Sequence, residues 1–78
     1  MLGMELIEVV AGRVKELRHA SGLEEQELAR RAGISLQTVS NLETGRLRDL
    51  KLSTLSKIAA ALAVSPEELL SSVDRRAA

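Results

Sequence analysis

The sequence contains no cysteine, no phenylalanine, tyrosine or tryptophan, and a single proline among its 78 residues. Without cysteine it can form neither a disulfide nor a thiolate metal site, which is compatible with a reducing cytoplasm. Without aromatic residues its core must be built from aliphatic side chains. No apolar run approaches the roughly 18 residues that a membrane span requires, and the N-terminus lacks the basic region of a secretory signal. We therefore expect a small cytoplasmic domain with no membrane segment.

An excess of charge of one sign is also lacking, since 11 basic residues are balanced by 11 acidic ones. Domains that bind nucleic acids are usually basic, so the total charge argues against that function. A bound polyanion responds to the local field, however, and three cations gather in the segment GRLRDLK at residues 45–51: Arg46, Arg48 and Lys51. Asp49 in the same segment keeps this local field modest.

Two short amphipathic helices are predicted on either side of Gly33, over residues 24–32 and 35–44. Gly33 stands where a helix often ends in a left-handed residue, and Ser35 supplies an oxygen that can cap the next helix. Four residues together have the spacing of a helix-turn-helix: Ala29, Gly33, Val39 and Leu42. Ala29 lies where the two helices must approach closely, so a larger side chain there would force them apart.

With these residues the chain resembles the phage-repressor and Cro-like DNA-binding domains, also called the xenobiotic-response-element family. The resemblance covers about residues 12–70 and includes the VSPEELL segment near the C-terminus. It implies an all-α fold, a compact five-helix lambda-repressor-like helix-turn-helix domain that occupies residues 1–78. The other helices are expected at 4–20, at 52–63 and after the capping box at 65–68, with a frayed tail at 74–78.

The first predicted helix carries an apolar arc of roughly 220°, although packing on one core requires only about 100°. The residues of this arc are Met4, Leu6, Ile7, Val9, Val10, Ala11, Val14 and Leu17. Two explanations remain open at this point. In the first, neighbouring elements wrap the helix closely or its Met-rich start is frayed; in the second, the surplus face meets a second copy of the chain.

The outer face of the third helix is where the resemblance places base recognition. In related domains this face enters the major groove, with the N-terminal residues of the helix over base edges. The amides of Gln37 and Asn41 suit the N6 and N7 atoms of adenine. Leu36 either presses on a thymine methyl group or folds back on the core. The residues expected to read bases are Leu36, Gln37, Ser40 and Asn41.

Hydroxyls and cations around the same helix are expected to contact phosphates, which fixes the register without carrying sequence information. These residues are Ser35, Thr38, Thr44, Arg46, Arg48 and Lys51. The family commonly pairs an arginine with a glutamate at the positions of Arg18 and Glu43. The resemblance therefore implies a structural ion pair that holds the first and third helices in register.

The start of the second helix departs from the family pattern. The family usually has Ser, Thr or Asn at the position of Glu24 and Gln at that of Glu25, where the glutamine reaches a DNA phosphate. The two carboxylates suit the positive helix N-terminus but would repel a phosphate. Gln26 could replace the missing glutamine only if the helix began one residue later. This departure weakens the expected phosphate contact.

No catalytic constellation is present, because His19 is the only histidine and has no evident acid–base partner. We expect no enzymatic activity, no cofactor and no metal site.

The function expected first is a sequence-specific double-stranded-DNA-binding transcriptional regulator of the repressor type. It would act as a homodimer that places two copies of helix 35–44 about one DNA turn apart. The alternatives are a protein-interaction module with weak or lost DNA binding, and the antitoxin of a toxin–antitoxin pair. Either alternative implies a protein partner, a toxin or another regulator.

Overall fold

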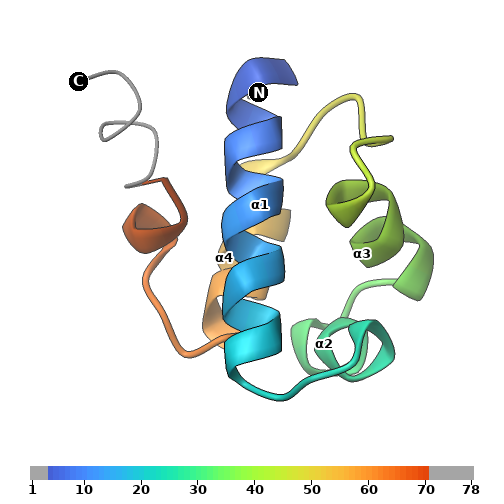
Figure 1. The fold of residues 1–78 in the computed structure, drawn as a ribbon, viewed down its shortest axis with the longest axis vertical. Coiled ribbons are helices and arrows are strands. Elements are labelled where there is room, and N and C mark those ends of the chain that lie inside the picture. The colour runs from blue at the N-terminus through green and yellow to red at the C-terminus, as the bar shows by residue number, and fades with distance from the viewer. Residues whose placement is uncertain (1–3, 71–78) are drawn as a thin grey trace.

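A computed structural model describes residues 4–70, with side chains from residue 6 onward. Its helices are α1 (Met4–Ala20), α2 (Glu25–Ala32), α3 (Leu36–Glu43) and α4 (Leu52–Ala61), followed by a helical segment at 66–70. In Figure 1, α1 runs upright with α2 and α3 to one side and the 66–70 segment to the other. No strand occurs within residues 4–70. The expected all-α, five-helix fold is confirmed, while the tail at 74–78 lies outside the described residues.

All five helical segments contribute to one aliphatic core, as the absence of aromatic residues required. The most deeply buried side chains include Val10 of α1, Leu28 of α2, Leu42 of α3, Ile58 of α4 and Leu69. Each such side chain contributes roughly 1.5–3 kcal/mol relative to an exposed position. Together they hold the short helices in place, since helices of eight to ten residues are not stable alone.

Most of the wide apolar arc of α1 is covered within one subunit. Ile7, Val10 and Val14 are buried, and the flanking Leu6 and Val9 are partly buried. Among the described residues, the large hydrophobic side chains that are exposed lie elsewhere, in α3 and α4. Neighbouring elements therefore cover most of the arc, while Leu6, Val9 and Leu17 stay partly exposed; the Met4 side chain lies outside the description.

The turn between α2 and α3 has the geometry that its sequence requires. Gly33 ends α2 with φ 70° and ψ 33°, a left-handed conformation that is strained for residues with a Cβ atom. The Ile34 N–H donates to the Ala29 carbonyl oxygen at 3.0 Å, which closes the turn. Ala29 is buried, and α2 packs against both α3 and α4.

Two features of the region after α3 differ from the sequence-based expectation. The loop that was expected to be only a connection inserts Leu50 into the core, where it is 2% exposed. The fourth helix ends at Ala61 instead of Ala63, because Ala63 adopts a left-handed φ of 60° that ends the helix. A residue in this conformation is usually glycine, so an alanine at this position does not indicate the end of a helix.

Candidate nucleic-acid interface

A buried ion pair fixes the position of α3 against α1. The Arg18 guanidinium donates from Nε and Nη2 to the two carboxylate oxygens of Glu43, at 2.7 and 2.8 Å. Their side chains are only 9% and 2% exposed. Arg18 also donates from Nη1 to the Leu23 carbonyl oxygen at 2.7 Å, which ties the loop before α2 to the same group. One guanidinium thus connects three segments of the chain.

The electrostatics of this pair favour the charged form of Arg18. The hydrogen bonds that Arg18 donates to Glu43 raise the pKa of Arg18 against the opposing effect of burial, and the negative charges of Glu43, Glu25 and Glu24 add to the rise. Bidentate pairing satisfies the donors that burial removes from water. The ion pair is internal to the fold and does not belong to the outer face of α3.

The outer face of α3 carries polar but uncharged side chains. Gln37 is exposed and Asn41 is partly buried, and neither lies beneath another element. The Gln37 Nε2 atom donates to Asn41 Oδ1 at 2.9 Å, so the two amides form a bonded pair on the surface. Leu36 is 47% exposed, which places it at the surface and not folded back into the core. Ser40 lies between these positions in the sequence and is partly buried.

The hydroxyl groups of Ser35, Thr38 and Thr44 form hydrogen bonds within the subunit. Ser35 caps the helix by accepting from the Thr38 N–H at 3.0 Å, and the two hydroxyls share one hydrogen bond at 2.8 Å. One of the two hydroxyl hydrogens therefore stays available to an outside acceptor. Thr44 donates its hydroxyl to the Ser40 carbonyl oxygen at 2.8 Å and would have to turn before donating to a phosphate.

The cationic loop is tied directly to the end of α3. The Asn41 carbonyl oxygen accepts from the backbone N–H groups of Arg46 at 2.8 Å and Leu47 at 3.1 Å. Further along, the buried Leu50 anchors the segment in the core. The side chains of the three cations are exposed: Arg46, Arg48 and Lys51. The loop backbone is therefore anchored at both ends, and its three cations are exposed directly after α3.

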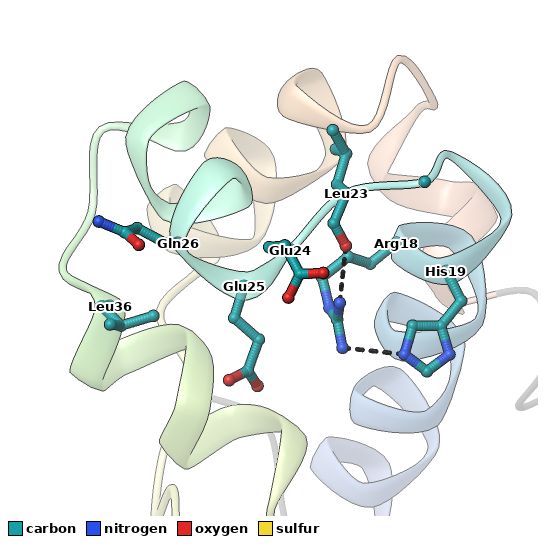
Figure 2. A pocket seen from close by; sticks show the side chains of 8 residues that line it. Arg18, His19, Leu23, Glu24, Glu25, Gln26 and Leu36 are labelled. Atoms are coloured by element: carbon teal, nitrogen blue, oxygen red, sulfur yellow. Dashed lines mark hydrogen bonds between the residues drawn. The ribbon is translucent and has the colours of Figure 1, made fainter.

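The start of α2 is acidic and borders an open depression. The depression lies between the end of α1 and the starts of α2 and α3, and its lining comprises Arg18, His19, Gly22, Leu23, Glu24, Glu25, Gln26 and Leu36. Glu24 is the N-cap residue but makes no side-chain cap, and α2 begins at Glu25. In Figure 2 the Gln26 amide points away from Arg18 and Glu24. Gln26 is thus the second residue of the helix and does not take the place of the glutamine that the family pattern requires.

Within the part of the chain that the structure describes, no group of three or more His, Cys, Asp or Glu side chains could hold a metal ion. None of the helices described there is both long enough and apolar enough to cross a membrane. The base-reading, phosphate and cationic candidates lie on α3 and the loop that follows it. The sequence analysis missed the hydrogen bond between Gln37 and Asn41, which their four-residue spacing could have suggested. It also missed the burial of the Leu50 side chain in the core.

Comparisons with known proteins agree with this geometry. Residues 14–69 match the model of a helix-turn-helix family, HTH_3. The chain is 38% identical over 71 residues to an uncharacterized HTH-type transcriptional regulator, y4dJ, of Sinorhizobium fredii, covering 91% of both chains.

Two solved structures have the same fold at substantial identity. The restriction-modification controller protein C.AhdI of Aeromonas hydrophila has a TM-score of 0.76 and 35% identity, with 81% of this chain and 94% of that chain covered. The master regulator for biofilm formation SinR, in complex with DNA, has a TM-score of 0.74 and 31% identity, with 78% and 97% covered.

Proposed function

The chain belongs to the helix-turn-helix family, and we propose that it is a sequence-specific double-stranded-DNA-binding transcriptional regulator of the repressor type. One observation carries the proposal: α3 presents an uncharged face of amides and hydroxyls, held from behind by a buried ion pair. A helix with no ligand usually carries Lys and Glu on its solvent face. The SinR complex supports the proposal by likeness, since that relative is bound to DNA.

In the proposed complex α3 lies in the major groove and its first turns face the base edges. The residues that read bases are Leu36, Gln37, Ser40 and Asn41. Phosphates are contacted mainly by the exposed cations that follow α3, with the hydroxyls of Ser35, Thr38 and Thr44 as further donors. The protein performs no enzymatic step in this role, and its target places it in the cytoplasm.

A second copy of the chain completes the proposal. Each subunit offers three exposed cations after α3, which is few for tight binding on its own. Two subunits would double the phosphate contacts and read two half-sites about 10–10.5 base pairs apart.

A salt titration of DNA binding tests the proposal. If Arg46, Arg48 and Lys51 each neutralise one phosphate, log Kobs should fall with log salt with a slope of about −5 for a dimer and about −3 for a monomer. Selection of bound sequences from a random DNA pool should return a palindromic motif. Failure to retain any DNA at low salt would overturn the proposal.

The acidic start of α2 favours a second candidate, a protein-interaction module such as an antitoxin that binds a toxin or another regulator. Glu24 and Glu25 would repel a phosphate at the position where α2 crosses the DNA backbone. The same titration separates the two functions, because a module of this kind would retain no DNA fragment and show no slope.

A further inference from the structure

We propose that Asn41 is a positioning residue for Gln37, and that the two amides form a coupled reading unit in which Gln37 selects adenine. The inference rests on the proposed function and adds to it the base that the site prefers. It starts from the bond between Gln37 Nε2 and Asn41 Oδ1, at 2.9 Å on the exposed face of α3.

The bond has a geometric basis in the helix. Residues four apart lie on one face of an α-helix, one turn from each other. The opposite face of α3 is fixed in the core by Val39 and Leu42, which are fully buried. The backbone under both amides is therefore rigid, and the remaining freedom is that of the side chains. An exposed glutamine samples several rotamers, so a bond to a fixed neighbour restricts which of them Gln37 presents.

The hydrogen-bonding inventory then decides which base fits. An amide group has two N–H donors and one carbonyl oxygen. One N–H of Gln37 is held by Asn41, so its free edge presents one donor and one acceptor. Adenine offers the complementary pair, the N7 acceptor and the N6 amino donor, whereas guanine offers two acceptors. Gln37 in this orientation therefore matches adenine and mismatches guanine.

With Asn41 Oδ1 turned toward Gln37, as in the structure, the opposite orientation of the Gln37 amide is disfavoured. If that amide turned over, its oxygen would face Asn41 Oδ1, and two acceptors would oppose each other without a hydrogen between them. Asn41 meanwhile keeps both of its own N–H donors. These suit an acceptor on a neighbouring base pair, such as thymine O4 or guanine O6. Asn41 thus acts on two positions of the DNA site, directly on one and through Gln37 on the other.

Selection from a random DNA pool with the full-length chain and its variants tests the coupling. Gln37→Ala should reduce the preference for adenine at one position about 10-fold or more. Asn41→Ala should reduce that same preference and also the preference at the neighbouring position. Asn41→Asp keeps an acceptor for Gln37, so it should preserve the adenine preference and lose only the neighbouring one. Gln37→Glu should change the preferred base from adenine to cytosine, whose N4 group donates to a carboxylate.

Ser56→Ala is the control, because Ser56 is exposed on α4, outside the helix that carries the amide pair, and it belongs to none of the proposed contacts. It should leave the adenine preference unchanged, and circular dichroism should show all variants folded. If Asn41→Ala alters the neighbouring position and leaves adenine untouched, the coupling is wrong while the proposed function stands. If the unaltered chain enriches no sequence, the proposed function fails and the coupling fails with it.

Discussion

The charged residues behind α3 differ from those near its two ends in their burial and in their pairing. Arg18 and Glu43 are buried, paired through two hydrogen bonds and tied to a third segment at Leu23. The cations after α3 are exposed. At the start of α2, Glu24 is exposed and Glu25 is partly buried. Water and salt screen the interactions of exposed charges, so these interactions are weak. Removal of one partner from a buried pair leaves the other charge buried and unpaired, which strongly destabilises the fold.

This contrast indicates a division of roles within one small motif. Buried charge holds the reading helix at its angle, uncharged amides face outward, and exposed charge adjusts the attraction to a polyanion. Variants of the buried pair should therefore change folding, and variants of the exposed groups should change binding without unfolding the chain.

The largest effect is expected for Glu43→Ala. It leaves the Arg18 guanidinium buried without its carboxylate, which should lower the free energy of unfolding by about 3–5 kcal/mol. Urea denaturation followed by circular dichroism at 222 nm measures this loss. In the double variant Arg18→Met, Glu43→Leu, apolar side chains fill the same space and should recover part of the stability. A loss below about 1 kcal/mol for Glu43→Ala would remove the distinction between buried and exposed charges.

Arg48→Ala should weaken DNA binding while leaving the fold intact. A unit charge about 4 Å from a phosphate in water contributes about 1 kcal/mol, so the Kd for every sequence should rise roughly fivefold per subunit. The salt slope should fall by about 0.9 per subunit, and the selected motif should stay the same. Fluorescence anisotropy with the selected site and with a scrambled duplex gives both quantities. Loss of preference at a single base would mean that Arg48 reads sequence.

Glu25→Gln should strengthen DNA binding, in the opposite direction to Arg48→Ala. A carboxylate about 9 Å from a phosphate costs about 0.5 kcal/mol in water, so its removal should lower the Kd roughly twofold per subunit at low salt. Glu67→Gln, in the exposed part of the 66–70 segment, is the control and should leave the Kd unchanged. If Glu25→Gln has no effect on DNA binding, the start of α2 lies away from the phosphates.

The smallest effect concerns the exposed ion pairs of α2. Arg30 and Arg31 hydrogen-bond the Glu27 carboxylate and lower its pKa below the ordinary value of 4.5. A lowered pKa in the folded state stabilises the protein above the pKa of the unfolded chain, and this contribution is lost as the pH falls through the folded value. Glu27→Gln should thus lower the Tm by about 1–3 °C at neutral pH. The difference should shrink as the pH falls below 4.5 and vanish once Glu27 is protonated in the folded state as well; a difference that persists in fully protonated protein would have another cause.

The helix-turn-helix was predictable because its signals are local. The spacing of Ala29, Gly33, Val39 and Leu42 depends only on helical geometry and on the left-handed turn, and both are present in the structure. The Arg18–Glu43 pair joins residues 25 apart and followed only from resemblance to the family. Periodicity within one helix cannot indicate which distant charge will meet another.

Other features could not be predicted from the sequence because tertiary contacts determine them. Leu50 stands among charged loop residues, and only the assembled core reveals that it points inward. Ala63 ends α4 in a conformation that alanine rarely adopts. The amide pair on α3 was identified as two separate readers, although their spacing allowed the bond that the structure contains. The sequence thus supplies candidate residues for the site, which stay a prediction, whereas the hydrogen bond between two of them came only from the structure.

The loop after α3 is held at both ends, by the Asn41 carbonyl oxygen at its start and by the buried Leu50 near its close. Ordering the backbone of one flexible residue costs roughly 1–2 kcal/mol. The loop backbone is already ordered by folding, so DNA binding does not have to supply the free energy of ordering it. The cationic stretch is preorganised, and electrostatic encounter can lead to a docked complex without a slow loop rearrangement.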